Sequence, residues 1–148
     1  MKISGSCLCG QIKFQVCGVV HMINNCHCSM CRKIHGAAYG SFMHVDADGF
    51  QWLCGAELIS TYQPPQQDER AFCSNCGSNM PVIEREDNNV VIPAGSLDTD
   101  PGLKPSMHIF TDSKAPWHEI TDSLPQFKEF PPQEWIEKEL EKIRQKST

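Results

Sequence analysis

The chain has 148 residues, a formal net charge of −5 and a hydrophobic content of 40%. This length fits a single domain, and no stretch approaches the roughly 18 apolar residues that a membrane-spanning helix needs. Asp and Glu outnumber Lys and Arg by 18 to 13, whereas a nucleic-acid-binding surface is basic. We therefore expect a soluble protein with neither nucleic acid nor a membrane as its partner.

Short apolar runs separated by turn residues follow one another from the N-terminus. Residues 11–16 alternate polar and apolar side chains, as a half-buried strand does. Similar runs recur at intervals of about ten residues, a rhythm typical of an all-β or mostly β domain. The further predicted strands cover residues 38–43, 50–53, 58–62, 80–83, 90–92 and 107–110.

The C-terminus has a different pattern. Two prolines precede residues 134–144, where Ile136, Leu140 and Ile143 recur at helical spacing. Acidic residues come first in this segment and basic residues last, which suits the helix dipole. We predict one domain over residues 1–130, followed by a helix and tail over 131–148. The helix is expected to dock on its own chain, and the oligomeric state stays open.

Cysteine is enriched, with nine residues in the chain. The first residues contain no apolar run typical of a signal peptide, and an odd number of cysteines cannot pair completely. In a reducing cytoplasm, such a pattern indicates metal binding rather than disulfides. Seven cysteines form three clusters. Cys17 and Cys54 lie outside them, and we expect both to be small buried hydrophobic side chains.

Two of the clusters together supply four thiolates, which is the ligand set of a closed, structural zinc site. Cys7 and Cys9 are two positions apart between glycines, and in an extended chain both would point to the same side. Cys73 and Cys76 form a Cys-x-x-Cys knuckle closed by a glycine that can adopt a left-handed conformation. We predict that these four cysteines hold a structural zinc ion.

The third cluster consists of Cys26, Cys28 and Cys31. Three protein ligands leave the fourth corner of a tetrahedral zinc free for water or substrate, as in catalytic zinc sites. Arg32 and Lys33 follow directly; they either attract a substrate carboxylate or form a solvated basic face. This cluster is the predicted catalytic zinc site.

Other ligand arrangements stay open at this point. A histidine could close the second site, and His35 is then a better candidate than His44 or His27, because His27 points away if its two neighbouring cysteines share a face. Ligands could also be mixed between clusters, for example Cys26 and Cys28 with the Cys-x-x-Cys pair.

With these residues assembled, the chain resembles the family of glutathione-dependent formaldehyde-activating enzymes, which includes the centromere protein V domain. The resemblance covers roughly residues 3–130, so the region 1–130 is expected to be a zinc domain of this kind. The matching stretches are Gly5-Ser-Cys-Leu-Cys-Gly10, Cys26-His-Cys-Ser-Met-Cys-Arg-Lys33, Phe72-Cys-Ser-Asn-Cys-Gly-Ser78, Ser113-Lys-Ala-Pro-Trp-His118 and Leu124-Pro-Gln-Phe127.

The resemblance implies a mostly β, zinc-clamped β-tent fold of the Mss4-like class. It implies two zinc ions per chain, with the same division of the seven cysteines into structural and catalytic ligands. The implied reaction is the condensation of formaldehyde with glutathione, a carbon–sulfur lyase activity on a small-molecule thiol and aldehyde. Arg32, Lys33 and Arg70 are the candidate contacts for glutathione, since they lie close to the clusters in the sequence.

Two other functions remain as alternatives. A non-catalytic, zinc-stabilised binding module of the Mss4-like class would have both metal sites closed. A thiol redox enzyme would need an exposed nucleophilic cysteine, and only Cys17 and Cys54 are available outside the clusters. Neither has a sequence context typical of a reactive thiol, so the redox function ranks last.

Overall fold

A computed structural model describes residues 2–147 of the chain, which form eleven strands in three sheets and two α-helices. The chain divides into two compact units, Met1–Val20 with Met43–Gly102 and His21–Phe42 with Leu103–Thr148. Strand β4 (Gly40–Asp46) runs from the second unit into the first. The mostly β fold with a C-terminal helix is therefore confirmed.

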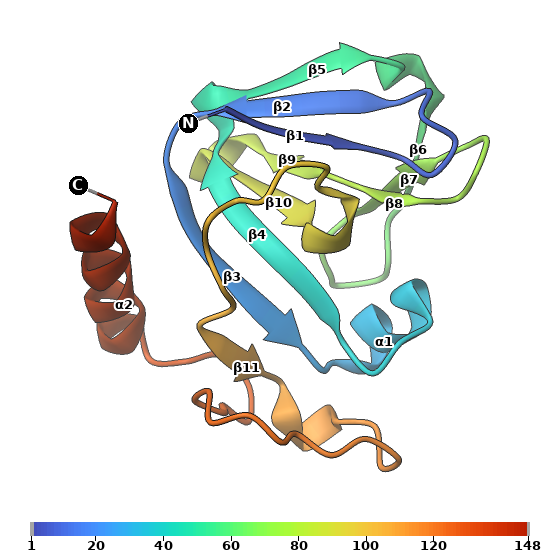
Figure 1. Cartoon of the computed structure of the whole chain (residues 1–148). Coiled ribbons are helices and arrows are strands. Elements are labelled where there is room, and N and C mark those ends of the chain that lie inside the picture. Colours follow the sequence, from blue (N-terminus) through green and yellow to red (C-terminus); the bar gives the residue numbers. More distant parts are fainter. Residues whose placement is uncertain (1, 148) are drawn as a thin grey trace. The chain divides into compact units, whose positions relative to one another are not determined.

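The first unit contains most of the strands (Figure 1). One sheet has the order β1-β2-β5 and another the order β6-β7-β8, and all of these neighbours are antiparallel. In this unit β4 continues the order β4-β10-β9. The strands are β1 (Lys2–Ser6), β2 (Lys13–Cys17), β5 (Phe50–Cys54), β6 (Ile59–Tyr62), β7 (Arg70–Cys73), β8 (Asn79–Met80), β9 (Val82–Glu84) and β10 (Asn89–Pro93).

The alternation along β2 buries one face of this strand. Phe14 and Val16 are buried, and the Phe14 ring lies 5.7 Å from that of Phe50 and 6.2 Å from that of Trp52. Gly5 faces the same ring from β1, and a Cβ at this position would lie 2.2 Å from Phe14 Cζ. Burial of such an aromatic side chain is worth about 2–3 kcal/mol. This packing holds the sheet just before the first two clustered cysteines.

The second unit contains strand β3 (Val20–Cys26), helix α1 (Ser29–His35), strand β11 (Met107–Ile109) and helix α2 (Gln133–Lys146). Its strand order is β11-β3-β4, and β11 runs parallel to β3. Helix α1 follows directly after the end of β3 (Figure 1). Helix α2 contacts its own unit, because the Trp135 ring lies 4.9 Å from that of Phe127 and Ile143 is buried. Neither helix of residues 2–147 has the length and apolar character needed to cross a membrane.

The structure contains the predicted C-terminal helix and, with shifted ends, the predicted strands other than 80–83. That run is divided at Pro81 into β8 and β9, which belong to different sheets. The sequence analysis missed β1, β3, β7 and α1. Helix α1 has only seven residues, too few for an apolar stripe to repeat. Strand β3 buries five consecutive residues from Met22 to Cys26 on both faces, so it lacks the alternation by which a half-buried strand is identified.

Candidate functional site

The first unit brings together Cys7, Cys9, Cys73 and Cys76, called here the four-cysteine group. All four Sγ atoms lie within 4.8 Å of one another; the Cys7–Cys9 distance is 3.5 Å and the Cys9–Cys73 distance is 3.9 Å. The two halves come from the turn between β1 and β2 and from the turn after β7. Four converging sulfurs are a ligand set that suits a tetrahedral metal ion.

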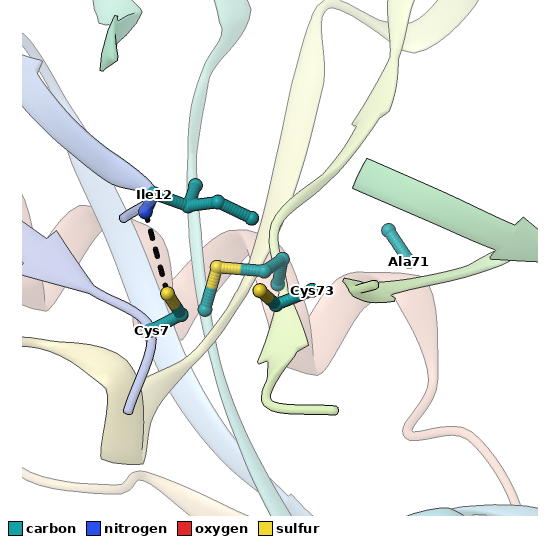
Figure 2. Packing of buried hydrophobic residues seen from close by; sticks show 5 residues of the cluster. Cys7, Ile12, Ala71 and Cys73 are labelled. Carbon is teal, nitrogen blue, oxygen red and sulfur yellow. Dashed lines mark hydrogen bonds between the residues drawn. The ribbon is translucent and has the colours of Figure 1, made fainter. Parts of the chain in front are cut away.

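Turns, and not an extended chain, direct these sulfurs inward. In an extended chain both sulfurs would face one side, but Cys7 and Cys9 lie on the turn that leads into β2. Gly10 N donates to Cys7 O at 3.0 Å, and Ile12 N donates to Cys7 Sγ at 3.3 Å (Figure 2). Gly77 N likewise donates to Cys73 O at 2.8 Å. The φ angles of Gly10 and Gly77 are 78° and 77°, a left-handed conformation that glycine adopts without strain.

The four-cysteine group is also part of the hydrophobic core. Cys7 and Cys73 are buried in one cluster with Ile12, Ala71 and Met80, part of which Figure 2 shows. A metal ion in this group would therefore connect two sheets of the first unit at their shared core.

Polar contacts favour the thiolate form of two of these four cysteines, Cys76 and Cys9. Ser78 Oγ accepts a hydrogen bond from Leu8 N at 2.8 Å and lies 3.3 Å from Cys76 Sγ. The Ser78 hydroxyl is the main cause that lowers the pKa of Cys76 to about 5. The side chain of Asn75 similarly lowers the pKa of Cys9. Since a metal ion binds the thiolate form, both contacts prepare the group for a metal.

The second unit brings together Cys26, Cys28 and Cys31, called here the three-cysteine group, whose Sγ atoms also lie within 4.8 Å of one another. Cys26 ends β3, Cys28 is the N-cap of α1, and Cys31 lies in the first turn of that helix. The Cys28 sulfur accepts a hydrogen bond from Cys31 N at 3.3 Å. The end of a strand and a helix start therefore position all three sulfurs.

The three thiols influence each other's ionisation. Hydrogen bonds from Cys26 and Cys31 lower the pKa of Cys28 to about 2. The hydrogen bonds of Cys26 with Cys28 and Cys31, and its burial, raise the pKa of Cys26. The charge therefore resides first on Cys28, at the helix N-cap, where the backbone favours an anion.

No histidine or carboxylate completes either group among residues 2–147. The structure thus gives no support to closure of the three-cysteine group by His27, His35 or His44. It brings the seven predicted ligands together as four and three. Their division into structural and catalytic roles remains a prediction.

Sequence reasoning missed a chain of buried polar side chains beside the three-cysteine group. His27 Nε2 lies 2.8 Å from His108 Nδ1, and His108 Nε2 lies 2.9 Å from a carboxylate oxygen of Asp122. The Cys-His-Cys spacing does place His27 between two ligands. However, no local sequence pattern indicates that His27 lies next to His108 or that His108 lies next to Asp122.

Basic groups also surround His27. Burial first, and then the nearby basic groups of His108, His118, Lys114 and Arg32, lower its pKa to about 4. The Nε atom of Arg32 is buried without a hydrogen-bond partner in the described residues, whereas Lys33 is exposed. Lys33 thus fits the solvated basic face, while Arg32 does not.

Arg70, the third candidate contact for glutathione, belongs to β7 of the first unit. Arg70 is on the same strand as Cys73 of the four-cysteine group. It belongs to a different unit from the three-cysteine group, which is the predicted catalytic site.

The two remaining cysteines correct one expectation. All nine cysteines are free thiols, and Cys17 and Cys54 are exposed instead of buried. Both lie at the last position of a strand, β2 and β5; Cys17 follows the buried Val16 and so lies on the opposite face of β2.

Comparison with known proteins identifies the family. The family model for the glutathione-dependent formaldehyde-activating enzyme matches residues 2–113. The chain belongs to this family. A Halomonas elongata protein, provisionally named as a glutathione-dependent formaldehyde-activating enzyme, is 35% identical over 129 residues, which cover 81% of this chain and 82% of that protein. The crystal structure of a Rhodobacter sphaeroides protein has a similar fold, with a TM-score of 0.55 and 21% identity over 67% of this chain and 92% of that chain.

Proposed function

We propose that this protein binds two zinc ions and joins a thiol to an aldehyde, or reverses that reaction, with glutathione and formaldehyde as the reactants that the family name suggests. This is a carbon–sulfur lyase-type activity. The observation that carries the proposal is the unequal ligand count: four sulfurs converge in one group and three in the other. Because the ligands are free thiols, we expect the protein to act in a reducing compartment such as the cytoplasm.

The donor sets fit zinc in two different roles. In the four-cysteine group the protein would fill every position of a tetrahedral ion, so this ion would be structural. In the three-cysteine group the chain supplies only three ligands. A zinc ion there would offer one open position, at which it lowers the pKa of a thiol or polarises a carbonyl oxygen.

The chain's own residues would bind and orient the thiol. Arg32 and Lys114 lie close enough to His27 to lower its pKa, and neither forms an ion pair with a carboxylate of residues 2–147. Two uncompensated cations beside the three-cysteine group suit the carboxylates of a glutathione-like thiol. Fixing the thiol there raises its effective concentration towards the aldehyde.

The proposed reaction needs no oxidant or reductant. The thiol sulfur forms a bond to the aldehyde carbon, and the π electrons of the carbonyl move to its oxygen. The proton that leaves the thiol ends on this oxygen, which gives an S-hydroxymethyl product. The reverse reaction follows the same steps backwards.

The test combines metal analysis with an adduct assay. The zinc content of the reduced protein is measured with and without glutathione and a mild chelator, and formation of S-hydroxymethylglutathione is followed by NMR. We expect two zinc ions per chain, one of them labile, and faster adduct formation than in buffer. Cys28→Ser should retain one ion and lose the rate enhancement.

The opposite result would favour the alternative function. Two tightly held ions that respond to neither reagent, with no rate enhancement, would overturn the proposal. A closed, zinc-stabilised binding module of the Mss4-like class would then explain the protein better.

A further inference from the structure

The chain of hydrogen bonds from Asp122 through His108 to His27 joins three separate segments of the second unit. His27 lies between two members of the three-cysteine group, His108 lies in β11, and Asp122 lies beyond both. The His27 and His108 side chains are 0% and 1% exposed, whereas that of Asp122 is 48% exposed. The hydrogen bonds thus run from the surface to the ligand-bearing turn.

The carboxylate sets the direction of every hydrogen bond in this chain. An ionised carboxylate only accepts, and the hydrogen bond from His108 lowers the pKa of Asp122. A neutral His108 ring therefore donates from Nε2, and its Nδ1 is left as an acceptor. His27 must then donate from Nε2 to this atom across 2.8 Å. His27 consequently carries its proton on Nε2 and a lone pair on Nδ1.

The backbone fastens the same turn to β11. His27 N donates to Ile109 O at 3.0 Å, and Cys26 is opposite Ile109 in the parallel pairing of β3 with β11. The turn is therefore held at its backbone and, through the imidazole ring, by His108.

We propose that Asp122 and His108 are positioning residues for the three-cysteine group: they lock the tautomer and ring orientation of His27, and so hold the turn that carries Cys26 and Cys28. The inference rests on the proposed function, since it assumes that this group binds a metal. Residues that orient ligands from outside a metal site commonly change metal affinity 10- to 100-fold, roughly, when they are replaced.

The substitution Asp122→Asn should reverse the chain of hydrogen bonds. One carboxylate oxygen of Asp122 accepts from Leu124 N at 3.0 Å, and the asparagine oxygen can keep this contact. His108 Nε2 lies 2.9 Å from the other carboxylate oxygen and 3.2 Å from this one. The amide group would replace the oxygen of the shorter contact and donate to His108 Nε2, which would become an acceptor. Both imidazole protons would move to Nδ1, and His27 would carry a buried N–H at an atom without a partner in the described residues. An unpaired buried donor is unfavourable, so the turn should lose its fixed position.

Two measurements on the reduced, zinc-loaded protein test this. Nitrogen-15 NMR of labelled histidines reads the tautomers of His27 and His108, and competition with a chelator reads the affinity of each metal site. In the wild type we expect both rings protonated at Nε2. In Asp122→Asn we expect protonation at Nδ1 and a loss of affinity of about 10- to 100-fold at the three-cysteine group alone. Asp112→Asn, an exposed carboxylate in the same unit, is the matched control and should change neither readout.

The outcomes separate this proposal from the proposed function. Three results would overturn the positioning role. The wild type could carry its imidazole protons on Nδ1, the tautomers could stay unchanged in Asp122→Asn, or Asp122→Asn could lose equal metal affinity in both cysteine groups. A second ion that Asp122→Asn binds as tightly as the wild type does would also overturn that role. A wild type that binds no second ion overturns the proposed function, and this proposal with it.

Discussion

The substitutions Cys9→Ser and Cys28→Ser each remove one thiol from one of the two groups, and they should differ in their effect on stability. Cys9 is exposed and Cys28 is only partly buried, so neither substitution leaves a cavity in the core. The difference between the two variants therefore reports on the metal connection that each one loses.

The magnitude follows from the length of chain that each metal closes. The four-cysteine group connects residues 64 positions apart, from Cys9 to Cys73. Closing a loop of this length removes entropy from the unfolded chain, which stabilises the folded protein by about 4 kcal/mol. The three-cysteine group spans five positions, from Cys26 to Cys31, which corresponds to about 2 kcal/mol by the same effect. We expect Cys9→Ser to lower the free energy of unfolding by about 2 kcal/mol more than Cys28→Ser does, or about 4–8 °C in Tm.

Urea unfolding of the zinc-loaded, reduced proteins measures this difference, with the zinc content of each variant determined beside it. Cys17→Ser, an exposed cysteine outside both groups, is the control and should unfold like the wild type. If Cys28→Ser is destabilised as much as Cys9→Ser at equal loss of zinc, the division into a structural and a catalytic site is wrong.

The other predictions concern individual contacts. Ser78→Ala should weaken metal binding at the four-cysteine group about 10- to 100-fold, because the hydroxyl contacts both halves of that group; Ser78→Thr should restore binding in a chelator competition. Arg32→Gln should raise the KM for glutathione and leave the zinc content unchanged, whereas Lys33→Gln, at an exposed position, should change neither the KM nor the zinc content. Equal effects of the two substitutions in steady-state kinetics would contradict a specific carboxylate contact. A thiol reagent should label only the exposed Cys17 and Cys54 in the zinc-loaded protein, and chelation should make the other seven thiols reactive; labelling of all nine before chelation would argue against the proposed metal sites.

Local sequence patterns predicted the parts of the fold that depend on neighbours along the chain. The alternation around Phe14 predicted β2, and the stripe of Ile136, Leu140 and Ile143 predicted α2, since both patterns express which face is buried. Helix α1 has no such pattern. It depends on the Cys28 N-cap and on the left-handed Gly36, whose N–H bonds back to the carbonyl of Arg32.

The sequence by itself determined which residues can bind a metal, because ligand type and close spacing are local properties: four and three thiols were countable before any fold was known. Only the tertiary structure decided how they meet. It brought Cys73 to Cys9 across 64 positions, and it placed Asp122 and His108 in a chain of hydrogen bonds to His27. Strand pairing and core packing bring such residues together. The segments that they join are far apart in the sequence, and no periodic pattern in the sequence indicates which segments will meet.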